Sequence, residues 1–111
     1  MDASLQEIVA RVEVSSKLLD RECSKENVIK FAEFCEPWKL IGRHLKLEDS
    51  ELAAIDSDYR TTEEKRVQAL SRWKNKSAHK ATYRVLIEVF MSCKQAKKAE
   101  KILKVIKHQS K

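Results

Sequence analysis

The sequence predicts an all-α protein in which six short antiparallel helices form one bundle and an additional N-terminal helix precedes them. Three observations indicate this fold class. The 111-residue chain contains one glycine and one proline, whereas a sheet protein of this length needs many turn residues. Apolar residues recur at helical spacing through most of the chain. A hydrophobic fraction of 42% and a charged fraction of 36% suit one buried core under a solvated surface.

The additional N-terminal helix is predicted over residues 4–19. Ser4 and Glu7 match a capping box at its start. The apolar stripe of this helix consists of Leu5, Ile8, Val9, Val12 and Leu19. We therefore assign residues 1–23 to the additional helix and residues 24–111 to the six-helix unit.

The first three helices of the bundle follow Ser24, which is a suitable N-cap. Pro37 interrupts the chain and suits the first turn of the next helix, which ends near Leu45. The third helix carries Leu52 and Ile55 and is otherwise acidic. The other residues predicted to face the core here are Val28, Ile29, Phe31, Ala32, Trp38 and Ile41.

Two further caps mark the last three helices. Thr61 and Glu64 match a capping box that opens the fourth helix, and Ser77 is a candidate cap for the fifth. Val85 and Val89 give the fifth helix a second apolar stripe, which predicts a central position. The other residues predicted to face the core are Val67, Leu70, Trp73, Tyr83, Leu86, Ile87, Phe90, Ala99, Ile102, Leu103 and Ile106.

Charge is distributed unevenly along the chain, whose net charge is +6. Residues 1–47 carry no net charge, residues 48–64 carry −6 and residues 65–111 carry +12. Opposite poles of this kind steer a second copy, or a similar domain, into head-to-tail contact. The basic half also suggests an alternative function, a basic helical nucleic-acid-binding domain. The acidic segment and the scarcity of aromatic residues among the basic ones argue against this alternative.

Cysteine usage points away from disulfides and metals. Cys23, Cys35 and Cys93 are odd in number and widely spaced, which is a poor disulfide framework. We expect buried or half-buried reduced thiols in a cytoplasmic protein. No cysteine pair has CxxC spacing, so we expect no metal site and no cofactor. The sequence also lacks a glycine-rich phosphate loop and any recognisable catalytic spacing, which argues against an enzyme.

The sequence shows no signal peptide and no run of about 20 apolar residues, the length needed to cross a bilayer. Lysines alternate with aliphatic residues over residues 94–107. Weak contact of this segment with a membrane surface is therefore a further alternative, although it lacks Trp and Phe. Packing against the core is the competing role for Ile102 and Ile106.

Four short stretches hold apolar residues, which we call anchors, in a distinctive order. These stretches are Trp38–Leu47, Leu52–Asp56, Leu70–Lys74 and Ala81–Leu86. A tryptophan, an Ile-Gly pair and a Leu-Lys-Leu precede the acidic third helix. A Leu-x-x-Trp ends the fourth helix, and an Ala-Thr opens the fifth. In this order the anchors resemble those of the death domain family over residues 25–106. The part from Tyr59 to Cys93 is most similar to adaptor-type death domains such as the Fas-associated one.

The chain departs from the family pattern at three places. Lys46 stands where many relatives carry glycine, and Glu48 stands at the usual Ser or Thr cap of the third helix. No glycine lies between Trp73 and Ala81. The caspase-recruitment type, which shares the six-helix plan, is therefore kept as an alternative subfamily.

The resemblance implies a non-enzymatic module that mediates homotypic assembly in intracellular signalling of apoptotic or innate-immune type. Its expected partners are other death-domain proteins or copies of itself. The resemblance also implies three charged contact patches. The first comprises Arg43, Lys46, Glu48 and Asp49, the second Glu51, Asp56, Asp58 and Arg60, and the third Arg72, Lys74, Lys76 and Lys80.

Overall fold

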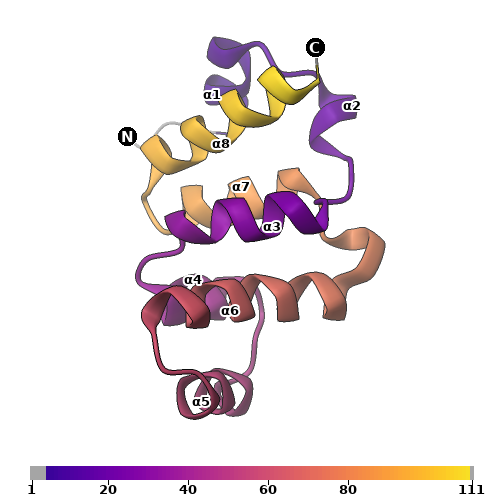
Figure 1. Cartoon of the computed structure of the whole chain (residues 1–111). Coiled ribbons are helices and arrows are strands. Elements are labelled where there is room, and N and C mark those ends of the chain that lie inside the picture. Colours follow the sequence, from indigo (N-terminus) through magenta and orange to yellow (C-terminus); the bar gives the residue numbers. More distant parts are fainter. Residues whose placement is uncertain (1–4, 111) are drawn as a thin grey trace.

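The computed structural model describes residues 5–110, and this part of the chain is helical with one isolated bridge between Glu22 and Thr82. Two 3-10 turns, η1 (Ala32–Phe34) and η2 (Ala78–Lys80), follow α3 and α6. The all-α prediction is confirmed, and α3–α8 are the six predicted helices of the bundle (Figure 1). The helices are α1 (Leu5–Val12), α2 (Ser16–Leu19), α3 (Lys25–Phe31), α4 (Trp38–His44), α5 (Asp49–Asp58), α6 (Thr62–Ser77), α7 (Tyr83–Ser92) and α8 (Ala96–Gln109).

Side chains satisfy free backbone N–H groups at the starts of five helices, α2, α3, α5, α6 and α7. The Asn27 N–H donates to Ser24 Oγ at 3.1 Å, so Ser24 caps α3 as predicted. Thr61 caps α6 as predicted, because its Oγ1 accepts from the Glu64 N–H at 3.1 Å. At α5, Glu48 and Glu51 form a reciprocal capping box. A glutamate pair thus stands where the family resemblance led us to expect a Ser or Thr cap.

The N-terminal segment was predicted as one helix, but it forms two. Glu13 ends α1 with a φ of 64°, in the left-handed region. The N–H groups of Glu13 and Val14 both donate to the Val9 carbonyl, at 2.8 and 3.2 Å. Ser15 then caps α2 by accepting from the Leu18 N–H at 3.1 Å. The turn keeps Val14 in the core. The predicted cap at Ser4 lies outside the described residues.

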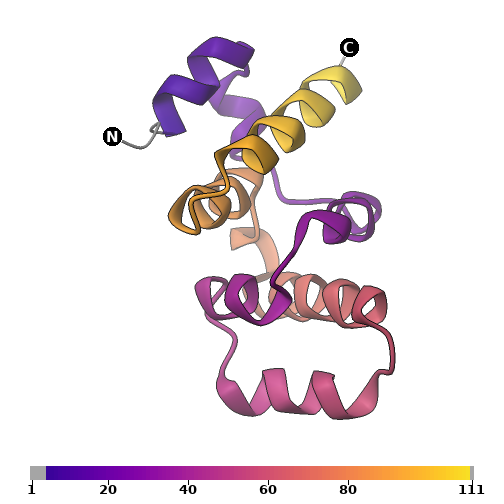
Figure 2. The same ribbon diagram turned by 90° about the vertical axis from the view of Figure 1, so that its left-hand side faces the viewer.

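The two N-terminal helices pack on the bundle, with α1 against α8 and α7 and α2 against α7 (Figure 2). Ile8, Val12, Leu18 and Leu19 belong to the same hydrophobic core as the bundle residues. The N-terminal segment therefore shares a core with α3–α8. The boundary between residues 23 and 24 stays a prediction.

The core centres on α7, where Leu86, Ile87 and Phe90 are fully buried. Trp38 and Trp73 are buried as predicted. A Cβ at Gly42 would lie 2.7 Å from Leu52 Cδ2, so α4 and α5 approach closely at this glycine.

Two residues predicted to face the core do not lie in it. Ile29 of α3 is 52% exposed and Val85 of α7 is 37% exposed. Successive residues of an α-helix are turned by about 100°. Ile29 follows the buried Val28 and Val85 precedes the buried Leu86, so each lies just beyond the buried face of its helix.

Ser77 does not cap a helix as predicted. It is the last residue of α6, and Thr82 caps α7 by accepting from the Val85 N–H at 3.3 Å. The η2 turn between them begins at Ala78, whose φ is 53°. Lys46, after α4, has a φ of 70°. Both φ values favour glycine, so the chain makes these turns without the glycines of similar sequences.

The molecule is elongated, with principal extents of 40 × 31 × 21 Å. Helix α5 lies at one end, and α1 and α8 lie at the other (Figures 1 and 2). Helices α3, α4, α6 and α7 lie between the two ends. The segment with the strongest acidic excess and the lysine-rich last helix are therefore far apart in the folded chain.

Candidate protein-interaction surface

The predicted contact residues lie on α4, α5, α6 and the turns that follow them. In the first patch, Arg43 Nε lies 3.5 Å from Asp49 Oδ1, and both side chains are more than half exposed. An exposed pair of this kind contributes little to stability. The Lys46 side chain is exposed, while Glu48 is engaged in capping α5. Arg43, Lys46 and Asp49 are therefore accessible to a partner.

The second patch divides into engaged and free charges. Asp56 lies between two lysines, with Oδ1 2.7 Å from Lys65 Nζ and Oδ2 3.0 Å from Lys39 Nζ. Hydrogen bonds from these lysines, Lys65 first, hold the pKa of Asp56 below its ordinary value. Asp58 and Arg60 are exposed and form no ion pair within residues 5–110. The free charges of this patch are therefore Asp58 and Arg60.

The third patch divides in the same way. Lys74 Nζ lies 2.7 Å from Glu22 Oε2, so it ties the end of α6 to the segment before α3. Arg72 and Lys80 have no ion-pair partner in the described part of the chain. Lys80 is exposed, whereas Arg72 is half-buried and its charge also helps to lower the pKa of Glu51.

Lys76 joins the three patches. Its Nζ lies 2.7 Å from Glu51 Oε1 and 3.4 Å from the Lys46 carbonyl oxygen. The hydrogen bond from Lys76, helped by the Glu48 N–H, lowers the pKa of Glu51. The end of α6 and the turn from α4 to α5 thus form one continuous charged surface, although they are separate in sequence.

A hollow of about 460 Å³ lies among α4, α6 and α7 beside this surface. This hollow was not predicted from the sequence. The one residue that could have indicated it is Val85, which lies on the second apolar stripe of α7 and borders the hollow. Three lysines and one carboxylate line it together with apolar side chains; these residues are Lys46, Lys76, Lys80, Glu88, Leu45, Trp73 and Val89. A side chain with both apolar and acidic atoms suits such a hollow.

The cysteines are free thiols. Burial raises the pKa of Cys23 and of Cys35 to about 12, so both thiols stay protonated and unreactive near neutral pH. Cys93 is half-buried, and partial burial raises its pKa as well. Residues 5–110 contain no group of three His, Cys, Asp or Glu side chains that could hold a metal ion. None of the described helices is long and apolar enough to cross a membrane.

Comparison with known families agrees with the order of the anchors. The Death domain family model matches residues 25–106, which hold α3–α7 and most of α8. Searches among curated proteins and among solved structures gave no significant match. The family match spans most of the chain and coincides with the six-helix bundle. The chain therefore belongs to the death domain family, whose members are protein–protein interaction modules without enzymatic activity.

Proposed function

We propose that the chain mediates homotypic death-domain assembly in cytoplasmic signalling, in a pathway of apoptotic or innate-immune type. The observation that carries this proposal is the family match over residues 25–106. Death domains bind other death domains, so the expected partners are other death-domain proteins or copies of this chain. The similarity of the part from Tyr59 to Cys93 to adaptor-type members supports an adaptor role.

The free charges support the three patches as contact surfaces. Asp58 and Arg60 in the second patch, and Arg72 and Lys80 in the third, have no ion-pair partner within residues 5–110. Exposed charges set the orientation and the rate of association. A second patch that faces the third patch of the next molecule gives a contact between unlike surfaces. Such contacts continue into a helical assembly unless they close into a ring.

The nucleic-acid alternative has weaker support. The family match does not favour it. Several cations that gave the C-terminal half its positive excess are also engaged within the molecule, since Lys65, Arg66, Lys74, Lys76 and Arg84 form ion pairs. The phosphate contacts that drive nucleic-acid binding need free cations.

Binding of the chain to a panel of death-domain modules, itself included, tests the proposal. The variant Arg72→Glu with Lys80→Glu should weaken binding about tenfold or more, because both charges are free to meet an acidic partner surface. The melting temperature should change little. The matched control Lys25→Glu with Lys30→Glu reverses two exposed lysines of α3 and should bind normally. A chain that binds no module of the panel at low salt contradicts the proposal.

A further inference from the structure

Helix α8 carries a row of basic side chains that form no ion pair within residues 5–110. Lys97, Lys101, Lys104 and His108 follow at spacings of four, three and four, which places them along one helix face. All four are exposed, and the ion pairs of α8 within residues 5–110 involve Glu100 and Lys107 instead. We call Lys97, Lys101, Lys104 and His108 the basic stripe.

The position of the basic stripe is unfavourable within the molecule itself. Like charges three or four residues apart on a helix repel each other. Lys97 also lies in the first turn of α8, where the helix dipole favours negative charge and no acidic residue is present. An acidic partner would relieve both effects.

Exposed acidic residues gather where α5 ends and α6 begins. Asp58, Glu63 and Glu64 are exposed there and form no ion pair within residues 5–110. Asp58 lies in the last turn of α5, where the helix dipole favours positive charge and no basic residue is present. We call these three residues the acidic corner.

The basic stripe lies on α8 at one end of the molecule, and the acidic corner lies where α5, at the other end, joins the start of α6 (Figures 1 and 2). The long axis of the molecule measures 40 Å, and exposed charges are largely screened beyond about 10 Å at 0.1 M salt. The two surfaces therefore do not compensate each other within one chain. Contact between them requires a second molecule.

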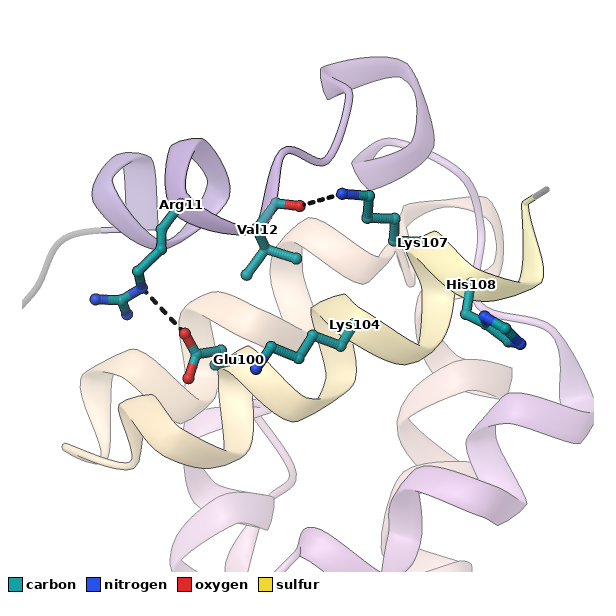
Figure 3. Close-up of a pocket in the computed structure, with 6 residues that line it drawn as sticks. All are labelled: Arg11, Val12, Glu100, Lys104, Lys107 and His108. Carbon is teal, nitrogen blue, oxygen red and sulfur yellow. Dashed lines mark hydrogen bonds and ion pairs between the residues drawn. The ribbon is translucent and has the colours of Figure 1, made fainter.

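A groove of about 460 Å³ between α1 and α8 adjoins the basic stripe. Lys104 and His108 line this groove, so the C-terminal half of the stripe borders a concave surface. Figure 3 shows how α1 is held beside α8 to form the other wall. Two of the polar contacts that hold it join Arg11 Nε to Glu100 Oε1 at 3.0 Å and Lys107 Nζ to the Val12 carbonyl oxygen at 2.7 Å.

We propose that the basic stripe and the adjoining groove of one molecule bind the acidic corner of a second copy of this chain. Complementary charge identifies the partner, because each surface carries the charges that the other lacks. The inference rests on the proposed function, since it describes an assembly contact of the same module. It adds a surface on α8 and α1 that lies outside the three patches. Because unlike ends of the molecule meet, the contact repeats from copy to copy.

Two charge-reversal variants test the contact. The stripe variant is Lys101→Glu with Lys104→Glu, and the corner variant is Asp58→Lys with Glu63→Lys. Sedimentation velocity at about 0.05 M salt should show species larger than a monomer for the original chain, because screening is weak there. These species should disappear at about 0.5 M salt. Each variant alone should lose this contact and form smaller species than the original chain, since its two surfaces now carry charge of the same sign.

An equimolar mixture of the two variants gives the sharpest measurement. The unaltered corner of the stripe variant meets the unaltered stripe of the corner variant, and the two reversed surfaces also complement each other. Association should therefore return in the mixture. Matched controls are Lys17→Glu with Lys25→Glu and the single change Glu26→Lys, which reverse exposed residues on α2 and α3. Both controls should associate like the original chain.

Several outcomes overturn the inference. A strictly monomeric original chain at low salt does so, as does a mixture that stays monomeric. If the corner variant loses association while the stripe variant keeps it, the corner binds another surface, and the proposed function stands without this contact. A stripe variant that associates normally but loses binding to random duplex DNA assigns the stripe to a polyanion. Loss of binding to every death-domain module is a separate result and contradicts the proposed function instead.

Discussion

The two ends of the molecule are held to its middle by different forces. Helix α5 buries Leu52 and Ile55, and its carboxylates form ion pairs with lysines of α4 and α6. At the other end, α1 contributes Ile8 and Val12 to the core, and the basic stripe is left unpaired. The buried residues of α8 are Ala99, Ile102, Leu103 and Ile106. Ion pairs also join α1 to α8, but the three carboxylate–lysine pairs of α5 accompany only two buried side chains, so charge contributes a larger share at the α5 end.

This difference shows that the net charge of a sequence segment does not equal the charge that the folded segment leaves unpaired for a partner. Residues 48–64 carry a net charge of −6, but Glu51 and Asp56 are compensated by lysines from outside that segment. The lysines of the basic stripe have no such compensation. Internal ion pairs thus decide which charges remain for a partner.

The largest expected effect comes from truncating the core at each end. Ile8 of α1 and Ile55 of α5 are both fully buried. Ile8→Ala and Ile55→Ala should each lower the free energy of unfolding by about 2–5 kcal/mol, through lost apolar contact and the cavity left behind. Urea denaturation followed by tryptophan fluorescence measures both. An unchanged midpoint for Ile8→Ala would mean that α1 is not part of the folding unit.

A smaller effect is expected from the polar cluster that joins α3, α7 and α8. The Asn27 Nδ2 donates to the Tyr83 hydroxyl at 2.6 Å and to Gln109 Oε1 at 2.8 Å, and Gln109 Nε2 donates back at 2.9 Å. Asn27→Ala should cost about 1–3 kcal/mol, because it removes the partner of the Gln109 amide and leaves the Tyr83 hydroxyl with only the Ser24 N–H as a donor. Thermal unfolding measures the change. Asn75→Ala, at an exposed position of α6, is the control and should have little effect.

The next effect separates two aspartates of the second patch. Asp56→Lys should lower the melting temperature, because it removes the partner of Lys39 and Lys65 and adds a like charge between them. Asp58→Lys should leave the melting temperature nearly unchanged, since Asp58 has no internal ion pair in the described structure. Differential scanning calorimetry at low and high salt distinguishes the two. Equal losses from both variants would disagree with the ion-pair arrangement.

The smallest effect is a local response to acid. Hydrogen bonds from Lys65 and Lys76 lower the pKa values of Asp56 and Glu51 below their ordinary values of 3.8 and 4.5. The stabilisation from these carboxylates is present above those ordinary values and is lost as the pH falls through and below them. Amide hydrogen exchange in α5 should therefore accelerate towards pH 3 before exchange in α8 does. Equal acceleration in both helices would contradict a special role for charge at the α5 end.

The sequence predicted the bundle well because its helices are short, amphipathic and clearly capped. Ser24 and Thr61 cap their helices as predicted, and the tryptophans lie in the core. The break at Glu13 was missed because neither glycine nor proline marks it. Ser77 was misplaced because Thr82 offers an equally good cap, and the η2 turn decided between them.

The contact residues were predicted from the family resemblance. The sequence alone does not show which of their charges form ion pairs within the molecule. Lys74 pairs with Glu22, which lies 52 residues away, and such a pair depends on tertiary packing. The same is true of the groove between α1 and α8, because it exists only when the N-terminal segment folds back on α8. Periodicity defines a helix face but does not say which distant element covers it.

The fold-back of α1 onto α8 also bears on how the module can be isolated. The family match runs from residue 25 to residue 106, whereas Gln109 binds Asn27 from beyond its end and Ile8 joins the core from before its start. A fragment trimmed to the matched range would uncover apolar surface on α7 and α8 and would tend to aggregate. We therefore expect the smallest soluble fragment to extend beyond the matched range on both sides.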